Sequence, residues 1–166
     1  MSEIPEYVVD RLFDAPRELV WRTWTDPELV ARWYGPNIET IIHKFELKPG
    51  GVWHNEMKWG EKSDLSTMTF EEIVPNEKLV WRQSSCDADW NAVANPMMPD
   101  WPRVVLTTVT FEERGDKTNV RLVWTPVDAS EAEIACFAAA VDNMGKGWGS
   151  GFAIIDDILA ELLVEK

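Results

Sequence analysis

Hydrophobic and polar residues alternate through much of the chain before residue 126, a pattern typical of strands with one buried face. The segments that show it are residues 6–13, 38–47, 52–59, 66–74, 78–84, 103–112 and 118–125. Turn residues separate them, for example Pro49-Gly50-Gly51, the polar run from Gly60 to Asp64, and Gly115-Asp116. Close spacing and short turns predict antiparallel pairing between neighbours.

Two short helices are predicted directly after the first strand. Pro16 suits a first helical position, where its missing N–H has no cost, so the first helix covers about residues 16–24. Asp26-Pro27 repeats the signal, with Asp26 as the N-cap, and the second helix ends near Gly35-Pro36.

The hydrophobic period changes from two residues to about 3.6 after Ser130. Ser130 and Glu133 form a capping box, which predicts a helix start. Apolar residues then follow one helix face, but glycines interrupt it at 145, 147, 149 and 151. Each glycine costs about 1 kcal/mol relative to alanine inside a helix. We therefore expect a helix at 130–143, a break near Gly145, and a long helix from about 148 to 163.

This order predicts one α+β domain spanning residues 1–166, with a curved antiparallel sheet and a long C-terminal helix. The helix residues expected to pack against the sheet are Trp148, Phe152, Ile155 and Leu159. A domain of this length buries about 70% of the surface that its unfolded chain exposes. It therefore holds a hydrophobic core without disulfides.

Charge and composition exclude several classes of partner. The net charge of −13 repels phosphate, so neither nucleic acid nor an anionic membrane is expected to bind. The N-terminus lacks a basic region followed by an apolar run, and no stretch is long enough to span a membrane. Cys86 and Cys136 form no disulfide framework. We expect a cytoplasmic protein.

Several segments together resemble the START-like (SRPBCC) superfamily, and within it the family related to the activator of heat-shock-protein-90 ATPase. The matching segments are Phe13-Asp14-Ala15-Pro16, Thr25-Asp26-Pro27-Glu28-Leu29, Arg32-Trp33-Tyr34-Gly35-Pro36, Pro49-Gly50-Gly51, residues 70–80 and Gly147-Trp148. The resemblance implies a helix-grip fold, in which about seven strands wrap around the C-terminal helix and enclose a cavity. The superfamily includes lipid and hormone carriers, polyketide cyclases and aromatases, so the fold alone does not fix the function.

The sequence offers no catalytic residue, metal site or cofactor site. The two histidines, His43 and His54, lack the spacing of metal ligands. Gly149-Ser150-Gly151 does not match the nucleophile elbow, and the glycine-rich stretch around it has no phosphate-loop lysine. We predict no catalytic residue, no metal and no cofactor.

The aromatic strand faces are the strongest functional signal, because the chain has ten tryptophans. They predict a pocket for an apolar or aromatic small molecule between the sheet and the C-terminal helix. The predicted ligand-binding residues are Trp53, Asn55, Met57, Trp59, Trp81, Gln83, Trp124, Trp148 and Phe152. The alternative for each aromatic residue is simple core filling, and Asn55 and Gln83 either orient a ligand or lie near the sheet rim.

Residues 85–102 form a long irregular segment between two predicted strands. Its apolar side chains are unfavourable in water, so it is expected to fold back on the protein. We predict a lid over the cavity mouth formed by Trp90, Met97, Met98 and Trp101. The alternative is a contact in a homodimer.

Three functions remain open from the sequence. The first is a binding protein for a hydrophobic or aromatic ligand. The second is an enzyme similar to a polyketide cyclase that uses the same pocket. The third is a co-chaperone-like interaction module, which requires an exposed apolar or charged patch.

Overall fold

The computed structural model describes residues 6–33, 39–59, 61–93, 100–143 and 149–164. Its strands are β1 (Tyr7–Phe13), β2 (Glu39–Phe45), β3 (Val52–Trp59), β4 (Lys62–Val74), β5 (Lys78–Ser85), β6 (Val105–Arg114) and β7 (Lys117–Pro126). Its helices are α1 (Arg17–Thr25), α2 (Pro27–Trp33), α3 (Glu131–Asn143) and α4 (Gly149–Val164). The order of strands and helices agrees with the prediction.

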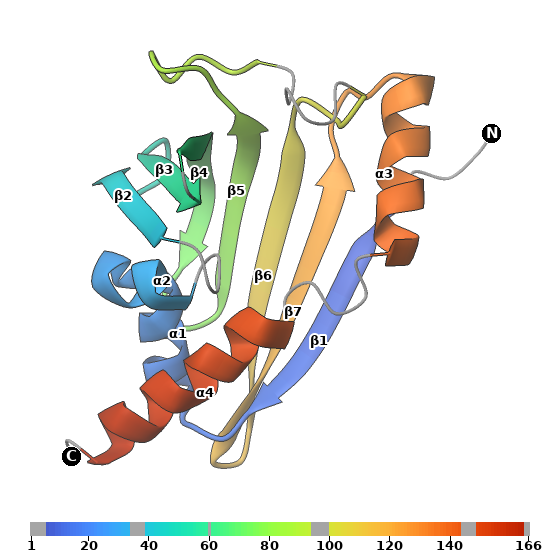
Figure 1. Cartoon of the computed structure of the whole chain (residues 1–166). Coiled ribbons are helices and arrows are strands. Elements are labelled where there is room, and N and C mark those ends of the chain that lie inside the picture. The colour runs from blue at the N-terminus through green and yellow to red at the C-terminus, as the bar shows by residue number, and fades with distance from the viewer. Residues whose placement is uncertain (1–5, 34–38, 60, 94–99, 144–148, 165–166) are drawn as a thin grey trace.

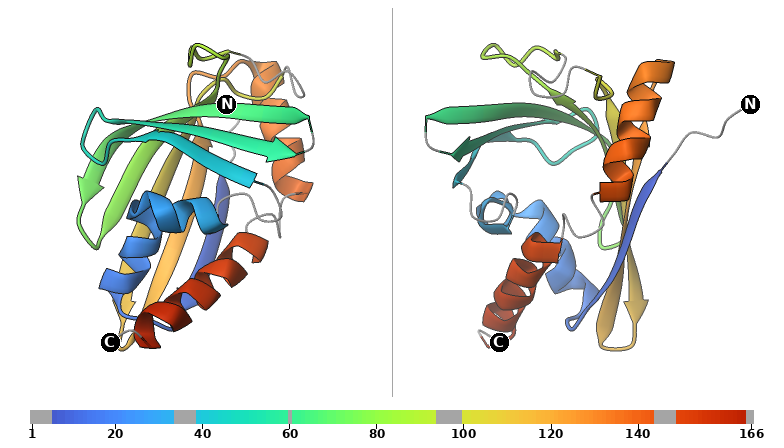
Figure 2. Two further views of the ribbon diagram at one scale, coloured as in Figure 1. Left: turned by 60° about the vertical axis from the view of Figure 1, so that its left-hand side comes forward. Right: turned by 45° about the vertical axis from the view of Figure 1, so that its right-hand side comes forward.

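The seven strands form one antiparallel sheet in the order β1-β7-β6-β5-β4-β3-β2. Strands β2 to β7 follow one another as a meander, and β1 joins beside β7. Figures 1 and 2 show that the sheet is strongly curved and that α1, α2 and α4 lie on its concave side. This arrangement confirms the expected α+β class and is consistent with a helix-grip fold.

Strand β4 begins earlier than the alternation predicts. The expected polar turn extended to Asp64, but β4 already starts at Lys62, which pairs with Trp59 of β3. Polar residues such as Ser63 and Asp64 extend the ladder because their backbone groups pair with β3, whatever their side chains prefer. Asp64 therefore becomes a strand residue, directly opposite Met57.

The turn between β2 and β3 requires glycine. A Cβ atom at Gly51 would lie 2.1 Å from the backbone oxygen of Glu46, closer than any real contact. Gly50 has a φ of 82°, in the left-handed region that favours glycine. This turn also supports β4, because the Gly51 carbonyl accepts a hydrogen bond from the Phe70 N–H.

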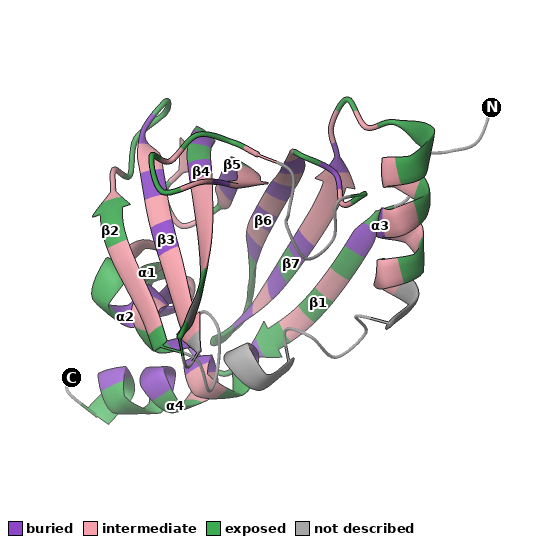
Figure 3. Cartoon of the chain, turned by 45° about the horizontal axis from the view of Figure 1, so that its top comes forward, coloured by how far each residue is buried: buried purple, intermediate pink, exposed green. Residues whose placement is uncertain are grey.

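Helix α4 buries the face that the sequence predicts. Phe152, Ile155 and Leu159 are at most 2% exposed, whereas Trp148 lies outside the described residues. Phe152 meets Phe13 of β1 edge to face, with ring centroids 5.6 Å apart. Figure 3 shows the corresponding alternation of buried and exposed stretches along α4.

Helix α3 stands apart from α4, beside β7 and β1 (Figures 1 and 2). Its start is the predicted capping box, since the Glu133 N–H donates to Ser130 Oγ and the Ser130 N–H donates to Glu133 Oε1. One of its side chains, Phe137, is fully buried and contacts Trp101. The two C-terminal helices therefore cover different parts of the molecule.

Candidate functional site

The deepest part of the concave face is an aromatic core. Trp53 of β3 and Trp81 of β5 are 3% and 2% exposed, and their rings meet edge to face with centroids 5.7 Å apart. Phe70 of β4 lies between these strands and contacts both rings. The structure therefore places Trp53, Trp81 and Phe152 of the predicted ligand set in the hydrophobic core.

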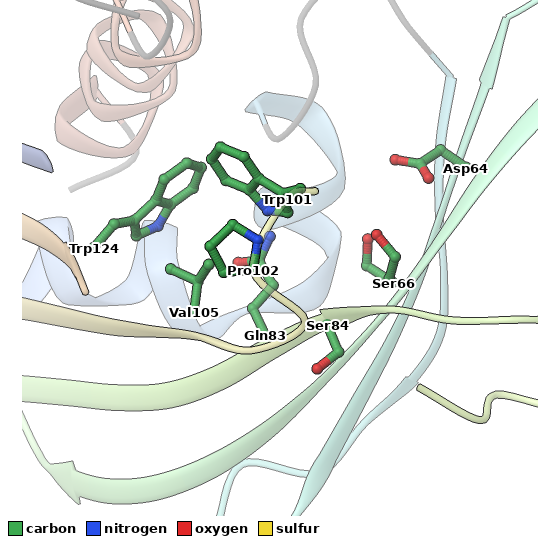
Figure 4. Close-up of a pocket in the computed structure, with 9 residues that line it drawn as sticks. Asp64, Ser66, Gln83, Ser84, Trp101, Pro102, Val105 and Trp124 are labelled. Atoms are coloured by element: carbon green, nitrogen blue, oxygen red, sulfur yellow. The ribbon is translucent and has the colours of Figure 1, made fainter. Parts of the chain in front are cut away.

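A cavity of about 90 Å³ lies toward the end of the sheet near Trp101. Figure 4 shows its lining, which is mixed polar and aromatic. The residues that line it are Asp64 and Ser66 of β4, Gln83, Ser84 and Ser85 of β5, Val105 of β6, Trp124 of β7, and Trp101 and Pro102 of the preceding segment. The cavity thus unites three predicted residues from distant parts of the sequence, namely Gln83, Trp101 and Trp124.

Asn55 is the most unusual polar side chain on this face. It is 1% exposed, and neither its Oδ1 nor its Nδ2 has a hydrogen-bond partner. Asn55 pairs in register with Ser66, so both side chains project from the same face of the sheet. A buried polar group without a partner costs about 1–3 kcal/mol. Such a group calls for an explanation, and a polar group of a bound molecule is one that completes its hydrogen bonds.

Thr107 of β6 repeats this feature. Its side chain is fully buried, and its Oγ1 has no partner. Thr118 of β7 is equally buried, but its hydroxyl donates to the carbonyl of Ala15 at 2.9 Å. The concave face therefore carries unmet hydrogen-bonding capacity at both Asn55 and Thr107.

Among the described residues that line the cavity, Asp64 is the only one with a carboxylate. Burial raises the pKa of this carboxyl above its ordinary value. No ion pair or hydrogen bond joins the side chain of Asp64 to another residue in the described part of the chain. The nearby Cys86 has its pKa raised to about 11, first by burial and then by the charges of Asp87 and Asp64. Its thiol stays protonated at neutral pH and is a poor nucleophile.

Trp101 closes one end of the cavity by packing within the chain. Its ring lies 5.3 Å from that of Phe137 in α3 and 6.3 Å from that of Trp124 in β7, both measured between centroids. It therefore connects α3 to the sheet at the cavity wall. This contact explains the half-buried state of Trp101.

Trp90 lies on the other face of the sheet, which corrects its predicted place over the cavity mouth. Its ring stacks on His54 with centroids 4.3 Å apart and an interplanar angle of 3°. His54 is a sequence neighbour of Trp53 on β3, so its side chain points away from the core. The segment between β5 and β6 thus contacts both faces of the sheet: Trp90 lies on the face of His54, and Trp101 lies on the face of Trp124. Met97 and Met98 lie outside the described residues.

Two further residues of the predicted ligand-binding set, Met57 and Trp59, lie on β3. Met57 is partly buried against the core, and the side chain of Trp59 is outside the described part of the structure. Sequence reasoning missed Asp64, Ser66, Ser84 and Ser85. Extending the β4 alternation backward from Met68 through Ser66 reaches Asp64, so the signal was present once the strand start was known.

No three histidine, cysteine or carboxylate side chains gather as metal ligands in the described ranges. Glu71 and Glu72 are exposed and pair with Arg82 and Lys78. No helix in the part of the chain that the structure covers is long and apolar enough to span a membrane.

Comparison with known proteins gives a family and a fold. The family model described as Activator of Hsp90 ATPase homolog 1-like protein matches residues 14–160. A crystal structure from Mycobacterium smegmatis has a TM-score of 0.75 and 22% identity, covering 94% of this chain and 91% of that one. A solution structure from Arthrobacter aurescens has a TM-score of 0.78 and 21% identity, covering 95% and 87%.

A third similar structure is larger than this chain. DynU16, described as a putative protein in the dynemicin biosynthetic locus, has a TM-score of 0.61 and 18% identity. The match covers 93% of this chain and 47% of that one. A comparison with curated proteins found no match. These identities establish a shared fold and carry no residue roles.

Proposed function

Because the chain belongs to the Activator of Hsp90 ATPase homolog 1-like family, we propose that it binds a small molecule on the concave face of its sheet. The ligand has an apolar or aromatic body and at least one hydrogen-bonding group. A cavity with aromatic walls and a few convergent polar groups is the usual form of such a site.

The observation that carries this proposal is the unpartnered amide of Asn55. The amide has a carbonyl acceptor and an NH₂ donor, so a ligand group with one donor and one acceptor pairs with both of its polar atoms. Ser66, its partner across the strands, lines the cavity and extends the polar surface toward Gln83. Trp124 and Trp101 supply the apolar wall on the other side.

One observation favours an enzyme as the second candidate. Asp64 is a half-buried carboxyl in a cavity, and burial raises its pKa. Such a group serves as a general acid or base when a substrate proton lies within reach. A cyclase-like reaction in the same cavity therefore uses Asp64, and replacing it with asparagine abolishes turnover.

Binding is tested first with phenethyl alcohol, a neutral aromatic probe with one hydroxyl. We expect saturable shifts in the NMR signals of the indole N–H groups of Trp101 and Trp124, each assigned from its Trp→Phe variant. Asn55→Leu weakens binding by about tenfold, as expected when one well-placed hydrogen bond is lost. Asn119→Leu is the matched control, because Asn119 is only half-buried on β7 and pairs with the exposed Leu12 of β1.

The proposal fails if no neutral, cationic or anionic aromatic probe shifts these signals saturably. It also fails if Asn119→Leu weakens binding as much as Asn55→Leu. Native mass spectrometry of the purified protein gives an independent measurement, since a retained ligand adds mass that denaturation removes.

A further inference from the structure

We propose that the ligand of this cavity carries a protonated amine, whose ammonium group binds at Asp64 while its carbon skeleton lies against Trp101 and Trp124. This inference rests on the proposed function and specifies the chemical class of its ligand.

The first argument is the charge balance at the cavity. The Asp64 side chain has no basic partner in the described ranges, and no lysine or arginine whose side chain the structure describes lines the cavity. Basic side chains elsewhere pair with carboxylates, for example Arg82 with Glu71 and Arg121 with Asp10. A desolvated carboxylate without a partner is unfavourable, and a bound cation restores the missing interaction.

The second argument is the arrangement of acceptors around the carboxylate. Ser66 follows Asp64 on the same face of β4, because their positions differ by two residues. Figure 4 shows Asp64 at one end of the cavity and the two tryptophans at the other, with Ser66 and Gln83 between them. An ammonium group has three N–H donors and no acceptor, so the Asp64 carboxylate and the Ser66 hydroxyl suit it. Gln83 Oε1 already accepts a hydrogen bond from Trp81 Nε1 at 3.4 Å and has one lone pair left.

The third argument is the aromatic wall. Indole rings bind cations on their faces more strongly than the other aromatic side chains do. Trp101 and Trp124 are both only half-buried, so they retain surface toward the cavity. They therefore suit the CH₂ groups next to an ammonium, which carry part of its positive charge, as well as an aromatic body.

The volume of the cavity and the net charge of the chain limit the chemical class of the ligand further. The cavity of about 90 Å³ is smaller than the cavity of about 150 Å³ that admits benzene in another protein. It takes a head group and its first carbons, while the rest of the molecule extends beyond it. The chain's net charge of −13 attracts cations and repels anions at long range.

The test compares three probes of similar shape with different charge: phenethylamine, phenethyl alcohol and 3-phenylpropionate. Binding is followed by isothermal calorimetry and by the indole signals of Trp101 and Trp124. We expect phenethylamine to bind most tightly and 3-phenylpropionate to bind least. Asp64→Asn weakens the binding of phenethylamine by about tenfold and that of phenethyl alcohol by much less, since only the cation loses a charge partner.

Asp116→Asn is the control for net charge, because Asp116 is exposed in the turn between β6 and β7. It removes the same charge as Asp64→Asn without touching the cavity, and we expect less than a twofold effect. The three probes on the unmodified protein test the inference even where Asp64→Asn fails to fold.

Two results separate the inference from the function beneath it. If phenethyl alcohol binds as tightly as phenethylamine, or if Asp64→Asn leaves the affinity for phenethylamine unchanged, the inference of an amine ligand is wrong. The proposal that the protein binds a small molecule is not contradicted by either result. If none of the three probes binds, both proposals are wrong.

Discussion

Replacing Asn55 with leucine should stabilise the ligand-free protein. The side chain is 1% exposed, and both polar atoms of its amide lack partners. Burying such a group costs about 1–3 kcal/mol, which leucine, with the same branched outline and no polar atoms, recovers. For a domain of this length, 1 kcal/mol shifts Tm by about 2–4 °C. The expected gain is therefore about 2–12 °C, measured by thermal and urea unfolding followed by circular dichroism.

Two buried threonines of the same sheet provide reference substitutions for the stability measurement. Thr107 and Thr118 are both fully buried, but only the hydroxyl of Thr118 has a hydrogen-bond partner, the carbonyl of Ala15. Thr107→Val should be neutral or stabilising, and Thr118→Val should destabilise by about 1–2 kcal/mol because it leaves that carbonyl unpaired.

The result that refutes the reasoning is a loss of stability in Asn55→Leu comparable to that of Thr118→Val. Asn55 would then hold the fold together through its hydrogen bonds, and its amide would be no sign of a ligand. A gain in stability together with weaker probe binding is the expected outcome. It is the usual exchange of stability for function at a binding site.

Three further predictions concern the core and two titrating groups. Leu159→Ala should lower the free energy of unfolding by about 2–5 kcal/mol in urea, since the side chain is 2% exposed in α4; an unchanged midpoint contradicts the packing of α4. His54 should titrate by NMR below its ordinary pKa of 6.5, mainly because burial disfavours its charged form, so its contribution to stability is lost as pH falls below 6.5. Trp90→Ala should return this pKa toward 6.5, and an unchanged value would show that the stacked ring does not bury the histidine. Asp64 has a raised pKa in the folded state, so it contributes stability below pH 3.8 that is lost as pH rises through the folded value. Asp64→Asn should therefore be more stable than the unmodified protein at pH 7 in urea unfolding, with the difference shrinking toward pH 3.8.

The alternation and the capping signals determined the secondary structure of this chain almost completely. Strand faces such as Val105, Thr107, Val109 and Phe111 are buried as the period of two requires. The capping box at Ser130 forms, and the C-terminal helices α3 and α4 are two separate elements, ending at Asn143 and beginning at Gly149; the expected break near Gly145 lies outside the described residues. These features follow from residues close together in sequence, so local physics is enough to predict them.

Tertiary structure decided which of these residues belong to the candidate site. The sequence predicted Trp53 as either a ligand-binding or a core residue, and Trp90 as part of a lid over the cavity. Trp53 lies in the core, and Trp90 lies on the opposite face of the sheet. The sequence placed Asp64 in a turn, whereas pairing with β3 carries this carboxylate into the cavity wall. Burial and partners depend on which distant strands and loops meet, and this is set by pairing register and long-range packing, which a local pattern of hydrophobic and polar residues does not contain.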